Sequence, residues 1–367
     1  MSRESGAHFL IAGGGTGGHI MPALAIANAL QARCGAEILF VGTARGLESR
    51  LVPQAGYRLE LIRAGQLNQV SLVTQVKTLV DLPRGLVQCT GLLRAFRPQA
   101  VIGVGGYASG PMMATAILAR VPTLAFEPNA VPGMANRLVG RWVTAAALNF
   151  APAAQYFRGA QVTGIPVRAE FFRLPERPAE TAPHLLVFGG SQGARALNQA
   201  MPKVAAALLE AVPGLTILHQ AGARHAETTL AAYQAGGAPR ERWKVATFLD
   251  DMAKRFEAAD LVLSRSGAST VAELCAAGKP ALLVPFPQSA DDHQRRNAEE
   301  MARAGAAQVL LEPDLTPETL LRTLSELLGD PVGLREMALR ARTLAHADAA
   351  ERIAAMAMEI AQRGKAA

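Results

Sequence analysis

The chain has 367 residues, a formal net charge of +7 at neutral pH, and a composition that is 50% hydrophobic but only 5% aromatic. This length predicts two domains of about 180 residues each. The basic residues are scattered and aromatic ones are scarce, whereas nucleic-acid surfaces combine basic clusters with stacking side chains. We therefore expect no nucleic-acid partner. The cysteines have neither disulfide nor zinc spacing, which fits a reducing compartment.

The first predicted strand, residues 9–12, leads into a glycine-rich loop, residues 13–18, and then into a helix. Such a loop is typical of an anion or phosphate site, because glycines allow close approach and a helix start favours negative charge. The loop also matches G-x-G-x-x-G. The next predicted strand, residues 37–41, ends at Gly42-Thr43 without a carboxylate for a ribose, which disfavours NAD. A tight turn without a ligand is the alternative.

His19 follows these glycines directly, at the predicted start of the helix. There the helix dipole opposes a second proton and keeps the imidazole neutral. A neutral imidazole is suited to act as a general base near pH 7. A residue that only hydrogen-bonds a phosphate is the alternative.

Strand-like and helix-like segments alternate along the chain, which predicts parallel sheets covered by helices. At residues 184–188 the pattern restarts with a strand, followed by a glycine loop over 189–193 and a helical run. Two such openings predict two successive nucleotide-binding folds. We expect an α/β protein with two Rossmann-like domains, residues 1–165 and 166–345, whose parallel sheets face across a cleft.

A third loop, residues 264–268, separates a predicted strand from a helix that begins near Ser269. The hydroxyls and N–H groups of the first helical turn would hold a phosphate, and Glu273 would accept hydrogen bonds from ribose hydroxyls. Thr270 and Glu273 also match a capping box, so an alternative role is to tie off the helix end.

An apolar stripe at helical spacing predicts either a membrane-facing or a core-facing helix. Its residues are Leu72, Val73, Val76, Leu79, Val80, Leu82, Leu86 and Val87, with Lys77 and Arg84 nearby. No apolar run reaches the roughly 18 residues that a spanning helix needs, so we expect no membrane crossing. Attraction to anionic headgroups is expected from Arg94, Arg97, Arg137 and Arg141, with Trp142 as an interfacial anchor.

Four motifs occur in the order seen in the MurG family of bacterial N-acetylglucosaminyltransferases of peptidoglycan synthesis, which the chain resembles over nearly its whole length. They are residues 14–19, 105–111, 189–195 and 264–273. The resemblance implies the GT-B arrangement, with a lipid-linked acceptor on the first domain and UDP-N-acetylglucosamine mainly on the second. It also implies that a C-terminal helix, residues 346–367, packs back on the first domain, and that the reaction inverts the anomeric carbon without a metal or cofactor.

The resemblance implies contacts with UDP-N-acetylglucosamine from Thr16, Gly17, Gly18, Asn129, Arg168, Ser191, Leu249, Arg265, Ala268, Ser269, Thr270, Val271, Ala272, Glu273 and Gln294. Arg168 would meet the charge of the departing UDP, and Leu249 would pair with the uracil through its backbone. Arg265 has a structural ion pair as its alternative role. Tyr107 and Ser109 would contact the acceptor.

Some members of this family have His-Glu-Gln-Asn where this chain has Phe126-Glu127-Pro128-Asn129. Glu127 is kept and is the rival to His19 as the catalytic base. The chain has no two aspartates at the D-x-D spacing of metal-dependent transferases, which supports chemistry without a metal. The alternative is a metal site, for which Asp291, Asp292 and His293 would be the candidate ligands.

We therefore expect an inverting glycosyltransferase that moves N-acetylglucosamine to the muramyl sugar of undecaprenyl-diphospho-N-acetylmuramoyl-pentapeptide. The resemblance implies a peripheral protein on the cytoplasmic face of the cell membrane, with cell-wall and division proteins as partners. Two alternatives stay open. A UDP-N-acetylglucosamine 2-epimerase would act on a soluble substrate and need no apolar stripe. A non-catalytic membrane-bound scaffold that binds a nucleotide sugar would need no base. The presence of two candidate bases, His19 and Glu127, disfavours this alternative.

Overall fold

The computed structural model describes residues 6–15, 17–44, 46–64, 72–177, 181–190 and 192–366. The side chains of residues 72–82 and 365–366 lie outside the description. Thr16 and Ser191 therefore fall outside the described residues, and so do the side chains of most of the apolar stripe (Leu72, Val73, Val76, Leu79, Val80 and Leu82) and of the nearby Lys77.

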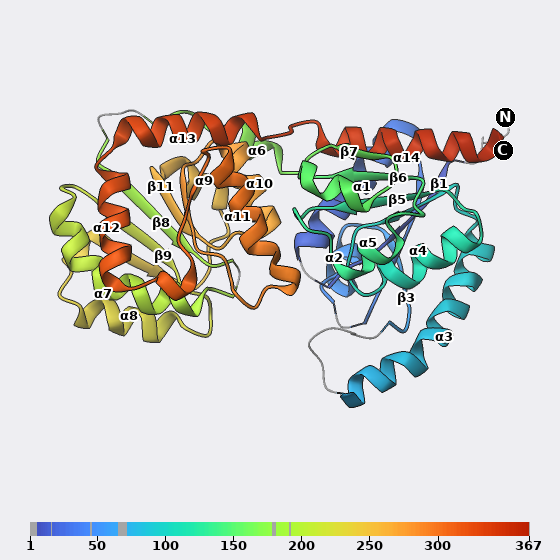
Figure 1. Cartoon of the computed structure of the whole chain (residues 1–367), viewed down its shortest axis with the longest axis horizontal. Helices are drawn as coiled ribbons and strands as arrows, with labels where there is room; N and C mark the ends of the chain where they lie inside the picture. The colour runs from blue at the N-terminus through green and yellow to red at the C-terminus, as the bar shows by residue number, and fades with distance from the viewer. Residues whose placement is uncertain are drawn as a thin grey trace. The chain divides into compact units, whose positions relative to one another are not determined.

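The chain forms two compact units, each built on a parallel sheet (Figure 1). Unit 1 comprises residues 1–166 and 348–367, and unit 2 comprises residues 167–347. The sequence predicts domain boundaries between residues 165 and 166 and between residues 345 and 346, and the units change between residues 166 and 167 and between residues 347 and 348. The expected fold class, two Rossmann-like domains with parallel sheets, is confirmed.

Unit 1 has a seven-stranded sheet in the order β3-β2-β1-β4-β5-β6-β7. Its central strands are apolar on both faces, as expected for a parallel sheet covered by helices. The strands are β1 (His8–Ala12), β2 (Glu37–Gly42), β3 (Arg58–Leu61), β4 (Ala100–Gly103), β5 (Thr123–Glu127), β6 (Ala145–Leu148) and β7 (Ala160–Val162). The helices are α1 (Gly17–Cys34), α2 (Glu48–Gln54), α3 (Leu72–Phe96), α4 (Ser109–Leu118), α5 (Met134–Val139), η1 (Ala151–Tyr156) and α14 (Ala349–Ala366).

The C-terminal helix α14, red in Figure 1, belongs to unit 1 and packs against α1, β4, β5 and β6. The Arg352 guanidinium donates to the carbonyl of Val162 at 2.8 Å, and Arg33 of α1 donates to the carbonyl of Glu351 at 3.3 Å. The chain thus returns to the first unit after completing the second.

Unit 2 has a six-stranded sheet in the order β10-β9-β8-β11-β12-β13. The strands are β8 (His184–Phe188), β9 (Thr216–Gln220), β10 (Trp243–Ala246), β11 (Leu261–Ser264), β12 (Ala281–Leu283) and β13 (Gln308–Val309). The helices are α6 (Ala169–Phe172), α7 (Arg195–Ala211), α8 (Ala226–Ala235), η2 (Arg240–Arg242), α9 (Met252–Ala258), α10 (Ala268–Ala277), η3 (Ala290–Asp292), α11 (His293–Arg303), η4 (Glu312–Asp314), α12 (Pro317–Leu328) and α13 (Pro331–Thr343).

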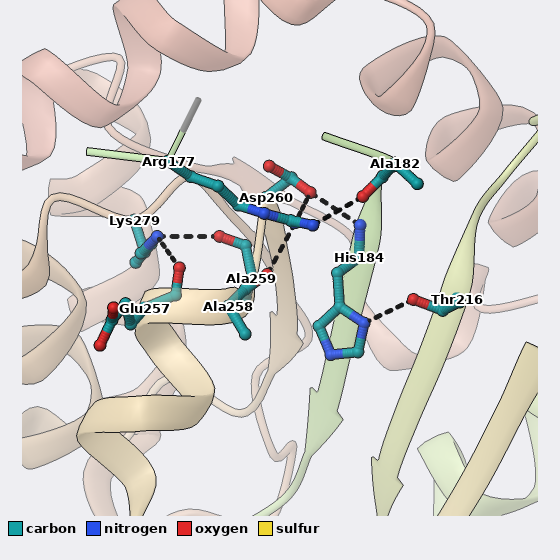
Figure 2. A network of polar contacts seen from close by, with 9 residues as sticks. All are labelled: Arg177, Ala182, His184, Thr216, Glu257, Ala258, Ala259, Asp260 and Lys279. Carbon is teal, nitrogen blue, oxygen red and sulfur yellow. Dashed lines mark hydrogen bonds and ion pairs between the residues drawn. The ribbon is translucent and has the colours of Figure 1, made fainter. Parts of the chain in front are cut away.

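A polar network ties the segment before β8 to the edge of the unit 2 sheet where β8 and β11 begin (Figure 2). Arg177 pairs with Asp260, whose carboxylate also accepts the backbone N–H of His184 at 2.7 Å. Lys279 donates to two carbonyls at the end of α9, at 2.9 and 3.1 Å. Lys279 and Arg177 thereby donate to the carbonyl groups that the C-terminal end of α9 leaves without intrahelical partners. This network lies at the start of the strands, whereas ligands of such folds bind beyond their carboxyl ends.

Candidate active site

In unit 1, the loops that follow four adjacent strands, β2, β1, β4 and β5, meet at the carboxyl edge of the sheet. The loop after β1 is held by neighbouring backbone and side-chain groups. The N–H of Gly13 donates to Val41 O at 3.0 Å and that of Gly14 to Gly105 O at 3.2 Å, while the N–H of Gly15 donates to the Glu48 carboxylate at 2.7 Å.

These bonds change the expected role of the glycine loop. The amides of Gly13, Gly14 and Gly15 are engaged inside the protein, so they do not form an open phosphate cradle. A helix leaves its first N–H groups without intrahelical partners. Donors for a ligand at this edge therefore come from the first turn of α1, which begins at Gly17 and Gly18.

His19 lies in the first turn of α1, and its ring packs on Gly105. A Cβ on Gly105 would come within 2.8 Å of the ring carbon Cε1, and the residue has a φ of +88°. Glycine is required here because the close approach and the positive φ both exclude a side chain. Of the two residues expected to contact the acceptor, Tyr107 is exposed. Ser109, the first residue of α4, is 1% exposed and faces the interior of the unit.

Glu127 ends β5 and is buried, with a solvent exposure of 2%. One carboxylate oxygen accepts the backbone and side-chain N–H groups of Asn129, at 3.0 and 3.1 Å. The other accepts the Gly133 N–H at 3.1 Å and the Asn136 amide at 2.9 Å. Burial outweighs these four bonds and raises the pKa of Glu127 to about 7. The carboxyl group thus holds the loop that carries Asn129.

In unit 2, the loop after β8 packs closely on the loop after β9. A Cβ on Gly193 would lie 1.9 Å from the carbonyl oxygen of Ala221, and the side chain of Gln220 donates to Gly190 O at 3.1 Å. Beneath these loops His219 is buried and contacts Asn198 at 2.9 Å and Tyr233 at 3.1 Å. Burial lowers the pKa of His219 to about 3.

Sequence reasoning missed this supporting layer of Asn198, His219 and Tyr233. Its only local signal is a polar residue on the otherwise apolar face of a helix, at Asn198 of α7. The partners lie 14 to 21 residues apart in the chain, so their contact depends on the packing of α7 and α8 on β9.

Glu273 and Arg168 lie together within unit 2. The Glu273 carboxylate is 3.7 Å from the Arg168 guanidinium, which also pairs with Glu170 at 2.9 Å and lies over the ring of Phe171. Burial raises the pKa of Glu273 to about 7, against the opposing charge of Arg168. A carboxylate and a guanidinium that are both partly exposed can meet ribose hydroxyls and a diphosphate, respectively.

The capping-box interpretation of Thr270 and Glu273 is wrong. Helix α10 begins at Ala268 with Gly267 as its N-cap, and no side chain bonds to that cap. Thr270 therefore lies inside the first turn. Of the donor residues expected here, Ala268, Ser269 and Thr270 are partly exposed, whereas Val271 and Ala272 are buried.

Arg265 is held inside unit 2 in an ion pair. Its guanidinium donates to the carbonyls of Val284 and Pro285 at 3.0 Å, pairs with Glu312, and lies over Phe286. With 8% of its surface exposed, it supports the loop after β12, as its alternative role implied.

Gln294 is oriented by the same region of unit 2. Its side-chain carbonyl accepts the backbone N–H groups of Ser266 at 3.3 Å and Phe286 at 3.1 Å. Leu249, expected to pair with the uracil through its backbone, has a buried side chain with 9% exposure. In the alternative ligand cluster, His293 lies 3.6 Å from Asp291.

Comparisons with known proteins agree with this architecture. Residues 9–148 match the glycosyltransferase family 28 N-terminal domain and residues 184–353 match the glycosyltransferase family 28 C-terminal domain. The structure is similar to the crystal structure of Acinetobacter baumannii MurG, with a TM-score of 0.81 and 31% identity over 96% of this chain and 99% of that one. A UDP-GlcNAc 2-epimerase from Neisseria meningitidis has a TM-score of 0.68 but only 12% identity, so that likeness concerns the fold alone.

Two relatives carry the name UDP-N-acetylglucosamine–N-acetylmuramyl-(pentapeptide) pyrophosphoryl-undecaprenol N-acetylglucosamine transferase. The protein from Anaeromyxobacter dehalogenans strain 2CP-C is 44% identical over 359 residues, which are 96% of this chain and 93% of the relative. The protein from Solibacter usitatus is 42% identical over 358 residues, 97% of each. With the match of both family 28 domains, this similarity over almost the full length shows that the chain belongs to the MurG family of N-acetylglucosamine transferases.

Proposed function

We propose that this protein transfers N-acetylglucosamine from UDP-N-acetylglucosamine to the muramyl sugar of undecaprenyl-diphospho-N-acetylmuramoyl-pentapeptide, with inversion and without a metal. The observation that carries this proposal is the 42–44% identity to transferases of that name over nearly the whole of both chains. The 2-epimerase alternative rests on a shared fold at 12% identity and is not favoured.

The donor is bound mainly by unit 2 in this proposal. Glu273 accepts the ribose hydroxyls, and Arg168, 3.7 Å from it, faces the diphosphate. The Gln294 amide donates to the sugar, because its carbonyl is already held by two backbone N–H groups. Leu249 pairs with the uracil through its backbone, and the first turn of α10 supplies N–H donors to the phosphate. Ser191 and Thr16 complete the donor set, with Gly17, Gly18 and Asn129 from unit 1.

The transfer itself is a single displacement. The acceptor's hydroxyl oxygen bonds to the anomeric carbon from the face opposite UDP, the bond from that carbon to the UDP oxygen breaks, and UDP leaves with the electron pair. His19 takes the hydroxyl proton as general base. Glu127 is less suited to this role, because both of its oxygens already accept hydrogen bonds, from the loop after β5 and from Asn136 of α5. Arg168 and the start of α10 offset the charge that develops on UDP.

The acceptor lipid requires access to a membrane surface. Within the described ranges, no helix is long and apolar enough to span a membrane. Exposed apolar and basic residues alternate at the end of α5, where Leu138 and Trp142 are 61% and 66% exposed beside Arg137 and Arg141. Such a surface favours anionic headgroups. We therefore place the protein peripherally on the cytoplasmic face of the membrane, where cell-wall and division proteins are its further partners.

The test is incubation of the purified protein with UDP-N-acetylglucosamine and a lipid-diphosphate muramyl peptide. UDP release that depends on the acceptor supports the transferase. Conversion of the UDP-sugar to its 2-epimer without the acceptor would establish the epimerase instead, and nucleotide-sugar binding without any turnover would establish the scaffold. Sedimentation with anionic vesicles, compared with neutral ones, tests the membrane surface separately.

A further inference from the structure

A buried carboxylate joins the first two loops of unit 1 and has no part in the chemistry described above. Glu48, the first residue of α2, is 1% exposed. Its Oε2 accepts the backbone N–H of Gly15 at 2.7 Å, and its Oε1 accepts both the N–H and the hydroxyl of Thr43 at 2.9 Å. A single side chain therefore links the loop after β1 to the loop after β2.

Three glycines leave room for this carboxyl group. A Cβ on Gly14 would lie 2.2 Å from the carboxyl carbon, one on Gly42 2.5 Å from Cγ, and one on Gly46 1.9 Å from Oε2. Gly14 comes from the loop after β1, Gly46 from the loop after β2, and Gly42 from the end of β2 itself. Part of the glycine richness of this edge is thus explained by the space that Glu48 occupies, and not by the approach of a ligand.

The same loop supports His19 from its other side. Gly14 donates its N–H to Gly105 O at 3.2 Å, and a Cβ on Gly106 would lie 2.2 Å from Gly14 O. Gly105 in turn packs on the His19 ring. Gly14 is therefore held between Glu48 on one side and the residues that contact the imidazole on the other.

Glu48 also supplies charge that α1 lacks. The first turn of α1 contains no acidic residue, although negative charge near a helix N-terminus is stabilising. The Glu48 carboxylate binds the N–H of Gly15, two residues before the helix begins. Three donors converge on its two oxygens, so only an acceptor of this length satisfies them.

We propose that Glu48 is a positioning residue for the transfer reaction: its carboxylate fixes the loop after β1 and the start of α1, and so holds His19 in place against Gly105. The proposal rests on the proposed role of His19 as the base. In this proposal Glu48, which is 1% exposed, acts through the loop and not by contact with donor or acceptor.

The first test is Glu48→Gln. This substitution replaces one carboxylate oxygen by an NH₂ group, a hydrogen-bond donor that would face a backbone N–H, which is itself a donor. We expect kcat to fall about 100-fold, since a displacement of about 1 Å at a reacting group has that effect. KM for UDP-N-acetylglucosamine should stay within twofold. The matched control is Glu60→Gln, which removes a partly exposed carboxylate of β3 paired with Arg58. A kcat within threefold of the parent, or a rise in KM with kcat unchanged, would overturn the proposal.

A double-mutant cycle tests the geometry directly. Gly46→Ala places a methyl group where the Glu48 oxygen lies, without a positive φ at that position. We expect Gly46→Ala alone to lower kcat relative to the parent. In a protein that already carries Glu48→Ala, the space is empty, and adding Gly46→Ala should lower kcat less than twofold further. The reason is that effects of two substitutions that share one contact are not additive. Additive losses would contradict the proposal. Because Gly46→Ala keeps the Glu48 carboxylate, the effect of this single variant on kcat remains informative if Glu48→Gln does not fold.

A spectroscopic measurement separates this proposal from the function on which it rests. In protein labelled with ¹⁵N-histidine, the His19 ring signals are assigned by their loss in His19→Ala. They should shift in Glu48→Gln and not in Glu60→Gln, while those of His8, at the start of β1 in the same unit, stay in place and report that unit 1 is intact. Unmoved His19 signals refute the positioning role. If the signals move but His19→Ala keeps full turnover, the base assignment fails instead.

Discussion

The side-chain amide of Asn136 donates to Oε2 of Glu127 at 2.9 Å and to the carbonyl of Phe126 at 2.9 Å, so one residue of α5 binds both the backbone and the side chain at the end of β5. Together with the bonds from Asn129 and Gly133, this contact engages both oxygens of Glu127. A base must have an oxygen free to approach the substrate proton. Glu127 therefore shapes the loop that presents Asn129, and His19 is the better candidate for proton transfer.

We predict that Glu127 makes the stability of the protein fall as pH rises. Burial raises its pKa from 4.5 to about 7, so between these values the folded protein keeps a proton that the unfolded chain has lost. The stabilisation is complete below about pH 4.5 and is lost as pH rises through 7, at up to about 1.4 kcal/mol per pH unit.

Thermal melting followed by circular dichroism at pH 5, 6, 7 and 8 measures this effect. Glu127→Gln should lose less stability over that range than the parent does, and Glu60→Gln, which changes a partly exposed carboxylate, should match the parent. Parallel curves for the parent and Glu127→Gln would show that Glu127 keeps an ordinary pKa in the folded protein.

His219 should act in the opposite direction. Burial lowers its pKa from 6.5 to about 3, so between these values the unfolded chain takes up a proton that the folded protein excludes. Stability is therefore lost as pH falls below about 6.5, by up to about 1.4 kcal/mol per pH unit. Urea unfolding followed by the fluorescence of Trp243, which stacks on Tyr233, measures it in the unit concerned. His219→Gln should flatten the acid slope; an identical slope in this variant would refute the prediction.

His19→Ala should lower kcat by roughly 10²- to 10⁴-fold and leave the affinity for UDP-N-acetylglucosamine nearly unchanged, because a general base acts in the transition state and not in donor binding. The acidic limb of the pH–rate profile should disappear. Turnover assays with the lipid-linked acceptor and calorimetry with the donor measure the two effects. Turnover within a few-fold of the parent would instead make Glu127→Gln the variant to compare.

Glu273→Ala should weaken binding of UDP-N-acetylglucosamine by about 1.5–3 kcal/mol, the loss expected for hydrogen bonds to a charged group, and should change the melting temperature little. Calorimetry measures the free energy of UDP-N-acetylglucosamine binding to the variant and to the parent. Glu170→Ala is the matched control, since it removes the nearer partner of Arg168 at 2.9 Å and leaves Glu273 in place. A large fall in melting temperature with unchanged affinity would mean that Glu273 serves the fold alone.

The alternation of strands and helices and the glycine loops were sufficient to predict both domains and the loops at the carboxyl ends of their strands. These signals are local: a buried parallel strand followed by glycines and a helix is visible within about 20 residues of sequence. The start of α10 was less certain. The pattern of Thr270 and Glu273 indicated a cap, but the chain leaves β11 through Gly267, which becomes the N-cap instead.

What the sequence by itself determined is the fold class, the two-domain organisation and the family, because these follow from periodicity and motif order along the chain. Only the tertiary structure decided which carboxyl groups are buried and what each one holds. Glu48 accepts the N–H of Gly15 across 33 residues of sequence. The physical reason is that neighbouring strands of a parallel sheet are joined by long crossovers, so the loops that meet at its carboxyl edge come from distant parts of the chain, and their contacts leave no local pattern.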